Sequence, residues 1–303
     1  MDLSVVVPTL NGRERLAASL DSVASAAPDA EVVVVNGPSA DGTTGMVRDR
    51  DDVDVLVEIA ARNVNVARNA GLEVAEGDVI AFLGYDHRIE SGWREAIADA
   101  VDDGARVVTG PLRRDVRGGA TSDSPERRTI GDREVTYFNG RNVAFRRAVL
   151  DELDGFDEYL QTGGARDAAH RLAGLGVDVA WRTDAAARRR AEATDGGVKT
   201  RELGWKYRAL AYRLAKNYGV RPTVARRTLS HATGDAVGAL RDVVDGKATP
   251  TAWVGNGHDV VTGISTGAAA GLRARARDRS PKRNPHGVSA RADRAVARYD
   301  RRE

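Results

Sequence analysis

Apolar and polar positions alternate in blocks along the first 110 residues of the chain. Four blocks are rich in β-branched residues and are predicted to form buried strands: 3–10, 30–37, 78–86 and 105–112. Three amphipathic blocks carry apolar residues at helical spacing: 12–26, 64–77 and 91–104. This order of strands and helices predicts an α/β fold with a mostly parallel sheet, flanking helices and right-handed crossovers.

The pattern changes in the second half of the chain. Residues 113–134 are polar and rich in Gly and Ser, which predicts a mobile loop near the ligand-binding edge. A strand with a short helix is predicted in 137–160, a loop with a helix in 163–176, and a further strand in 177–181. After Trp181 the sequence becomes rich in Arg and Ala. We therefore predict one α/β domain over 1–184 and a basic, mainly helical extension over 185–303.

The net charge of +2 conceals a strong asymmetry. Residues 185–303 hold 25 of the 46 Lys and Arg but only 11 of the 44 Asp and Glu, which leaves 21 against 33 for residues 1–184. The first part is therefore acidic and the extension basic. A basic, aromatic-bearing extension predicts contact with an anionic surface, for which lipid headgroups and nucleic acid are the two alternatives. We favour lipid, because no nucleic-acid recognition motif occurs in the sequence.

Composition removes several classes of protein. The chain has no cysteine, so disulfides and thiolate metal sites are excluded. It begins with an apolar strand pattern rather than a signal peptide, and no apolar run reaches the roughly 18 residues of a spanning helix. These features favour a cytoplasmic protein that is peripheral on the cytoplasmic membrane face.

Five segments appear in a fixed order along residues 3–182. They read "VVVPTLNGRERL", "VVVVNGPSADGT", "ARNAGLEVAEGDVIAFLGYD", "NGRNVAFRRAVLDELDGFDE" and "RDAAHRLAGLG". With these segments at this spacing, the chain resembles a family-2 glycosyltransferase of the GT-A fold, which has a Rossmann-like sheet. The resemblance implies a nucleotide-sugar donor that binds beyond the carboxyl ends of the parallel strands.

The resemblance also suggests donor-binding residues. Pro8 and Thr9 follow the first strand and match positions near the base and ribose, and Asn36 stands where the family usually has an Asp. Asp41 is either a donor contact or simply a turn or cap carboxylate. Arg68 is either a diphosphate ligand or part of a salt bridge on a helix face.

The Asp-Xaa-Asp motif of the family corresponds here to Gly84 and Asp86. The resemblance assigns Asp86 to a Mg²⁺ or Mn²⁺ ion that neutralises the diphosphate, and one carboxylate can be sufficient for such an ion. His87 is a further candidate ligand, although a lone His is more often hydrogen-bonded within the protein. The predicted transferase depends on this metal role, which fails if Asp86 faces away from the cleft or if a protein cation holds it with no room for an ion.

The family's general base corresponds to Ala165, with Gly164 before it, and neither can accept a proton. Three explanations remain open. The acceptor can be an anion such as a polyprenyl phosphate, which needs no base. Alternatively, Asp167 or His170 can serve as the base through a rearranged loop. In the third, the chain is a catalytically degenerate protein that binds the nucleotide-sugar without turnover.

Residues 201–219 predict a helix in which aromatic and basic residues alternate. Such a helix either lies at the headgroup level of a membrane or caps the catalytic domain with its apolar stripe. The basic stretch 273–303 is expected to be partly disordered or to lie on an acidic surface. Taken together, the sequence predicts a glycosyltransferase of glycan assembly with a lipid-linked or polyprenyl-phosphate acceptor.

Overall fold

The computed structural model describes residues 1–114, 124–189, 203–222, 250–278 and 284–302. The first half contains β1 (Leu3–Thr9), α1 (Arg13–Ala26), β2 (Glu31–Asn36), α2 (Thr43–Arg48), β3 (Val55–Ile59), α3 (Val64–Val74), β4 (Val79–Leu83), β5 (Arg88–Ile89), α4 (Trp93–Asp102), β6 (Val107–Thr109) and β7 (Leu112–Arg114). The second half contains β8 (Arg127–Ile130), β9 (Arg133–Thr136), β10 (Asn142–Arg146), α5 (Arg147–Leu153), α6 (Gly164–Leu175), β11 (Val179–Trp181), β12 (Ala187–Arg189), α7 (Leu203–Tyr218), α9 (Pro250–Arg277), a 3-10 turn (Val288–Ala290) and β13 (Ala295–Asp300).

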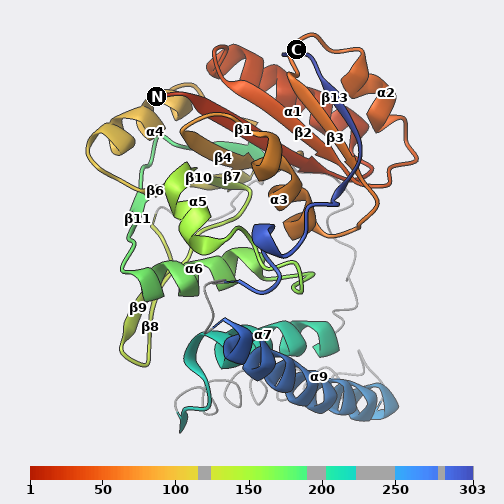
Figure 1. The fold of residues 1–303 in the computed structure, drawn as a ribbon, viewed down its shortest axis with the longest axis vertical. Coiled ribbons are helices and arrows are strands. Elements are labelled where there is room, and N and C mark those ends of the chain that lie inside the picture. Colours follow the sequence, from red (N-terminus) through yellow and green to blue (C-terminus); the bar gives the residue numbers. More distant parts are fainter. Residues whose placement is uncertain (115–123, 190–202, 223–249, 279–283, 303) are drawn as a thin grey trace.

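The main sheet has eight strands in the order β11-β6-β10-β4-β1-β2-β3-β13 (Figure 1). Within it β1, β2, β3 and β4 run parallel, whereas β10 and β13 are antiparallel to their neighbours. The predicted α/β class with a mostly parallel sheet is therefore confirmed.

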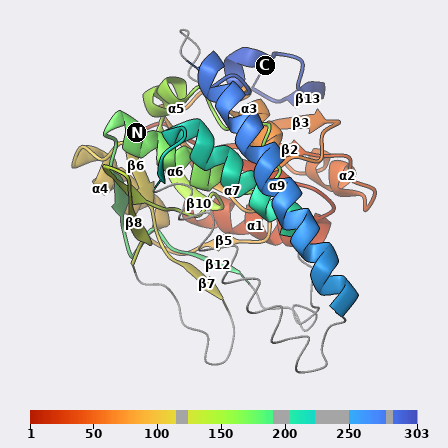
Figure 2. The same ribbon diagram turned by 90° about the horizontal axis from the view of Figure 1, so that it is seen from below.

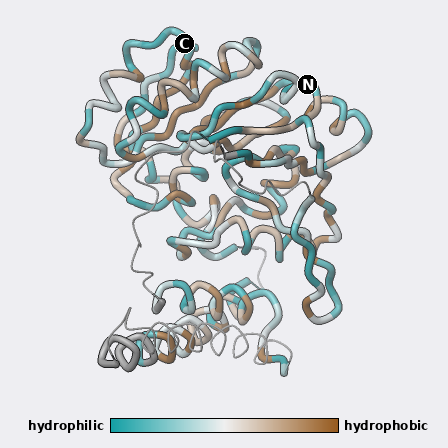
Figure 3. Tube along the Cα trace, turned by 180° about the vertical axis from the view of Figure 1, so that it is seen from behind, coloured by the Kyte–Doolittle hydropathy of each residue, from teal (hydrophilic) through white to brown (hydrophobic). Residues whose placement is uncertain are grey.

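Helices cover both faces of this sheet, because alternate residues of each strand point to opposite sides. On one face, Val6 packs with α3, α5 and α6. On the other, Val5 and Val7 pack with α1 and α4. Gly71 of α3 lies directly on β1, where an added Cβ would come within 2.3 Å of Val6 Cγ1. Figure 3 shows the resulting apolar strands between more polar surface segments.

The structure adds a strand that the sequence analysis did not predict. β3 is a five-residue strand whose flanks and interior carry Asp52, Asp54 and Glu58. These carboxylates obscured the alternation of Val53, Val55 and Val57. The block predicted as the third strand is therefore the fourth, β4.

Two further segments contain strands that were not predicted. The interval 113–134, predicted as a mobile loop, contains β8 and the start of β9, while residues 115–123 lie outside the described residues. The other segment follows residue 184, the predicted domain boundary. β12 follows that boundary, yet it pairs with β5 and β7 in a small second sheet. Arg189 is consequently part of the α/β domain.

The described part of the extension begins with α7, which packs against α6 and forms a helix pair with α9 (Figure 2). The apolar side of α7 is buried through Tyr207, Leu210 and Leu214. The helix therefore caps the α/β domain with its apolar stripe, which was one of the two predicted arrangements. None of the helices in the described ranges is both long and apolar enough to cross a bilayer.

A buried charge cluster attaches α7 to the domain. Lys216 Nζ donates hydrogen bonds to Asp157 Oδ2 at 2.5 Å and to Asp167 Oδ2 at 3.1 Å, and all three side chains are at most 1% exposed. Arg171 Nε donates to Asp167 at 2.9 Å, and Asn217 Nδ2 donates to it at 2.9 Å. Burial acts to raise the pKa of Asp167, but Lys216 and Arg171 outweigh it and lower that pKa to about 2.

The C-terminal segment returns to the α/β domain along its acidic edge. β13 pairs with β3, and Arg302 forms an ion pair with Glu31. Arg294 is fully buried between Glu73 and Glu158. The basic stretch 273–303 was expected to be partly disordered or to lie on an acidic surface. Its described residues 284–302 do lie along acidic side chains of the domain.

Arg294→Ala is expected to detach this segment from the domain. The substitution leaves the Glu73 and Glu158 carboxylates without their shared cation, which costs about 3–5 kcal/mol of unfolding free energy for a buried pair. Urea unfolding of the variant measures this loss. Arg298→Ala, on the exposed side of β13, is the matched control and should change stability by less than about 1 kcal/mol. Equal effects of the two substitutions would contradict the anchoring role.

Asp167→Asn tests the buried charge cluster through its pH dependence. The folded pKa of Asp167 is depressed below its ordinary value of 3.8. Its contribution is therefore present above about pH 4 and is lost as the pH falls towards 2. At pH 7 the variant should lose about 3–5 kcal/mol of unfolding free energy relative to the unsubstituted chain, and this difference should narrow below pH 4. Asp178→Asn, at an exposed position, should show no such pattern.

Candidate functional site

The carboxyl ends of four parallel strands meet along one edge of the main sheet. The register pairs Thr9 at the end of β1 with Asn36 at the end of β2, and Asn36 with Glu58 in β3. β4 ends at Leu83 beside β1, and the turn Gly84–Asp86 follows it. The structure therefore brings the predicted donor-binding segments together at the edge where ligands bind in such sheets.

The loop after β1 contains a polar atom that has no partner. Thr9 is 5% exposed, and its Oγ1 makes no hydrogen bond within the described parts of the chain. Pro8 precedes it and is half-buried. Because buried hydroxyls are normally hydrogen-bonded, Thr9 Oγ1 is available to a polar ligand at this edge.

Asn36 uses its amide within the protein. Its Nδ2 donates to Thr44 Oγ1 at 2.9 Å, and its Oδ1 accepts a hydrogen bond from Ser39 at 2.7 Å. Thr44 in turn donates to Glu58 at 2.7 Å. Asn36 thereby holds the loop after β2 in place, and Glu58, which the sequence analysis did not identify, completes this chain of hydrogen bonds.

Asp41 caps the local backbone. It accepts hydrogen bonds from the Thr43 hydroxyl at 2.5 Å, from the Thr43 amide at 3.1 Å and from the Arg13 amide at 3.1 Å. These bonds, that from the Thr43 hydroxyl first, lower the pKa of Asp41. The structure thus contains the cap alternative, in which Asp41 joins the starts of α1 and α2.

Arg68 lies under the site as a buried cation. Its Nη1 donates to Asn65 Oδ1 at 3.0 Å, and its Nη2 donates to the Gly140 carbonyl at 2.7 Å. Its Nε has no partner in the described chain, and the residue is 6% exposed. Burial, together with the charge of Arg141, lowers the pKa of Arg68 to about 10, so the guanidinium stays charged at neutral pH.

The Asp86 carboxylate is held by neighbouring side chains. Its Oδ1 lies 2.8 Å from His87 Nδ1, and its Oδ2 forms an ion pair with Arg189 Nε at 2.8 Å. Burial acts to raise the pKa of Asp86, but His87, Arg141 and Arg189 outweigh it and hold that pKa at about 2. A protein cation thus holds the carboxylate, an arrangement that counts against the metal role.

The turn after β4 is packed against basic side chains. A Cβ placed on Gly84 would lie 2.7 Å from His87 Nδ1 and 3.0 Å from Arg141 Cβ. Arg141 itself is exposed. Within the described ranges, no three His, Asp or Glu side chains gather as a metal site. In this arrangement the residues do not fit a divalent ion.

The two candidate bases lie below the site in the protein interior. Asp167 is fully buried in the cluster with Lys216 and Arg171. His170 is 1% exposed, with Nδ1 at 2.8 Å from the Tyr218 hydroxyl and Nε2 at 3.4 Å from the Tyr137 hydroxyl. Both side chains are therefore held by partners in the protein interior and are shielded from solvent.

Sequence analysis missed the arginines of the site for a simple reason. Arg141 follows the "NG" turn before β10, and Arg189 lies beyond the predicted domain boundary. Neither forms a motif with its neighbours in the chain. The register of β12 with β5 and β7 is what carries Arg189 to Asp86.

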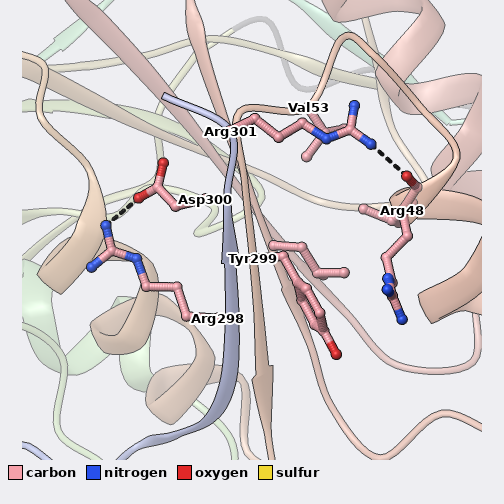
Figure 4. Close-up of a pocket in the computed structure, with 8 residues that line it drawn as sticks. Arg48, Val53, Arg298, Tyr299, Asp300 and Arg301 are labelled. Atoms are coloured by element: carbon pink, nitrogen blue, oxygen red, sulfur yellow. Dashed lines mark hydrogen bonds and ion pairs between the residues drawn. The ribbon is translucent and has the colours of Figure 1, made fainter. Parts of the chain in front are cut away.

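A half-open cavity of about 560 Å³ lies elsewhere, between α2, β3 and β13. Arg48, Arg298, Tyr299 and Arg301 are among its lining residues, and the Arg48 guanidinium lies 4.5 Å from the centre of the Tyr299 ring (Figure 4). Val53 and Leu56 place it at the start of β3, away from the carboxyl ends of the strands. It is therefore separate from the candidate site.

The chain has several curated relatives of low identity. It is 28% identical over 198 residues to "Glycosyltransferase AglE" of Haloferax volcanii, covering 56% of this chain and 63% of the relative. It is 28% identical to "Polyprenol monophosphomannose synthase" of Mycolicibacterium smegmatis, covering 50% and 63%, and 28% identical to "Glucosyl-dolichyl phosphate glucuronosyltransferase" of Haloferax volcanii, covering 52% and 56%. The chain thus spans less than two thirds of the length of these relatives.

Solved structures share the fold. S. aureus TarS in complex with UDP-GlcNAc matches with a TM-score of 0.61 at 18% identity, covering 92% of this chain and 91% of that one. Mannosyltransferase PcManGT from Pyrobaculum calidifontis, in complex with GDP-Man and Mn²⁺, matches with a TM-score of 0.56 at 20% identity, covering 92% and 88%. The family model "Glycosyl transferase family 2" matches residues 4–156, half of the chain. The resemblance noted in the sequence is therefore confirmed, and the chain belongs to glycosyl transferase family 2.

Proposed function

We propose that the chain transfers a sugar from a nucleotide-sugar donor to an anionic acceptor of the polyprenyl-phosphate type, as a step of glycan assembly. The donor would bind along the edge formed by Thr9, Asn36 and Asp86. Fold relatives with bound UDP-GlcNAc and GDP-Man support a donor of this class. The unpartnered Thr9 Oγ1 and Arg68 Nε supply polar groups that a nucleoside diphosphate could use.

The proposed acceptor class rests on the residues that occupy the position of the family's general base. Positions 164 and 165 are Gly and Ala, and Asp167 is fully buried between Lys216 and Arg171. A neutral hydroxyl acceptor would therefore lack a proton acceptor at the expected place, at a cost of about 10²–10⁴ in rate. A phosphate acceptor is already an anion and avoids this cost.

The chemical step needs no proton transfer when the acceptor is a phosphate. A phosphate oxygen forms a bond to the anomeric carbon while the bond from that carbon to the donor diphosphate breaks. The electron pair leaves with the nucleoside diphosphate, and the anomeric centre is inverted, as the family resemblance implies. The protein's contribution is to position the two substrates and to exclude water.

The resemblance also implies Mg²⁺ or Mn²⁺, and a fold relative was solved with Mn²⁺. In this structure, however, both Asp86 oxygens are engaged by neighbouring side chains, and Gly84 offers no second carboxylate to such an ion. The cofactor assignment therefore has the support of the relatives but not of the side-chain arrangement.

The acceptor class agrees with the name of one relative, a polyprenol monophosphomannose synthase, whereas a second relative, a glucosyl-dolichyl phosphate glucuronosyltransferase, is named for a lipid-linked sugar. Such an acceptor resides in a membrane, and an anionic membrane surface is the partner proposed for the basic extension. In the described part of that extension, Trp205 is 41% exposed on α7 and Arg208 lies 5.2 Å from its ring. An exposed aromatic beside a cation suits the headgroup level.

Transfer assays with radiolabelled nucleotide-sugars test this proposal. UDP-, GDP- and dTDP-linked sugars are combined with a polyprenyl phosphate, a lipid-linked glycan or a free sugar. We expect label on the polyprenyl phosphate at a rate at least about 100-fold above that on a free sugar, because only the hydroxyl requires a base. Preferred transfer to the free sugar would contradict an anionic acceptor. Binding of a nucleotide-sugar without turnover on any acceptor would support the alternative, a catalytically degenerate binding protein.

A further inference from the structure

We propose that arginine side chains, chiefly Arg141 and Arg189, replace the divalent cation of this site and neutralise the donor diphosphate, with Asp86 as their positioning residue. This inference rests on the proposed function, because it concerns how the same donor is held. It follows from the disagreement between the cation that the family implies and the side chains that surround Asp86.

The first observation is the saturation of Asp86. Its side chain is 6% exposed, and each carboxylate oxygen has a partner at 2.8 Å: His87 Nδ1 for Oδ1 and Arg189 Nε for Oδ2. A metal ion would have to displace a guanidinium from a partly buried ion pair before it could bind. Breaking such a pair is costly, because it leaves a charge without a partner in a medium of low polarity.

The second observation is the packing around Gly84. An added Cβ there would approach His87 Nδ1 to 2.7 Å, Arg141 Cβ to 3.0 Å and Arg141 Cδ to 3.1 Å. A second acidic side chain at this position would require Arg141 and His87 to move. The place of the missing carboxylate is therefore occupied by the stem of an arginine.

The third observation is the state of Arg141. The residue is exposed, and among the described residues its guanidinium has no hydrogen bond or ion pair. Its stem packs on Gly84, in the same turn as Asp86, and the carbonyl of the preceding Gly140 accepts a hydrogen bond from Arg68. A cation held near a second buried cation is electrostatically unfavourable unless an anion joins them.

The formal charges match the requirement of a diphosphate. Arg68, Arg141 and Arg189 bring three positive charges and Asp86 brings one negative charge, so the group carries a net +2, the formal charge of Mn²⁺ or Mg²⁺. The planar guanidinium also presents paired donors that match phosphate oxygens, which a point charge does not. Arginines can thus supply both the charge and the geometry.

In this proposal, the arginines act on the negative charge that forms on the leaving diphosphate. When the bond between the anomeric carbon and the diphosphate oxygen breaks, the electron pair stays on that oxygen. Guanidinium groups already oriented towards it stabilise the growing charge without rearranging. The Asp86 carboxylate and His87 contribute by fixing the direction of Arg189.

Calorimetric binding of nucleoside diphosphates to the full chain separates this arrangement from a metal site. UDP, GDP, CDP, ADP and dTDP, with the matching monophosphates, are titrated in excess EDTA and again with Mn²⁺ or Mg²⁺. We expect one diphosphate to bind in EDTA with an affinity within about threefold of that in metal, because the protein's own donors hold it. Binding that requires metal would overturn the inference and leave the proposed function intact.

Arg141→Ala should weaken binding of that diphosphate in EDTA by about 10- to 100-fold, the value of a charged hydrogen bond, and should weaken the monophosphate less. Arg106→Ala is the matched control. Arg106 precedes β6 at the opposite end of the sheet and pairs with Glu152 on the surface. An unchanged affinity in Arg141→Ala would overturn the inference.

Asp86→Asn gives an independent check, because the amide keeps one oxygen for Arg189 but cannot serve as an anionic metal ligand. Diphosphate binding in this variant should weaken by the same factor in EDTA and in metal, because a neutral amide holds Arg189 less firmly than the carboxylate does. A loss above about tenfold that appears only with metal would identify Asp86 as a metal ligand and overturn the inference. Failure of every diphosphate to bind under any condition would overturn the inference and the proposed function together.

Discussion

The ammonium group of Lys216, buried between Asp157 and Asp167, holds the basic extension on the α/β domain. It joins α7 of the basic extension to α6 and to the loop before it. Such a buried pair adds little net stability over a well-packed apolar pair, but it tolerates the loss of neither partner. By engaging Asp167 in this way, the chain also removes the one acid near the start of α6 from the chemistry of the site.

The burial of Asp167 among cations and the arginines around Asp86 both make this site differ from the one that the family resemblance implies. The site offers positive side chains where the family resemblance implies a metal, and it offers Gly164 and Ala165 where the resemblance implies a base. Both changes suit substrates that are themselves anions. A nucleoside diphosphate leaving group and a phosphate acceptor would each find cations, and neither would require a proton to be removed.

The central sheet could be predicted because its strands β1, β2 and β4 are almost wholly apolar and its helices keep a clear 3.6-residue period. β3 was missed because its alternation is interrupted by carboxylates, which in the folded chain accept hydrogen bonds from Arg50, Val32 and Thr44. Thr9, Asn36, Asp41 and Asp86 could be assigned to one edge because parallel strands end on the same side. What each side chain does there could not be predicted, because hydrogen bonds such as that from Asn36 to Thr44 join loops that are separate in sequence.

Local periodicity and residue identity at fixed spacing were sufficient to predict the fold class and the family. The contact of Asp86 with Arg189, the burial of Asp167 and His170, and the completion of the main sheet by residues 295–300 could be found only in the folded chain. Each of these depends on residues far apart in the chain. Pairing energies between such residues are set by the distance and burial that folding creates, which no local pattern encodes.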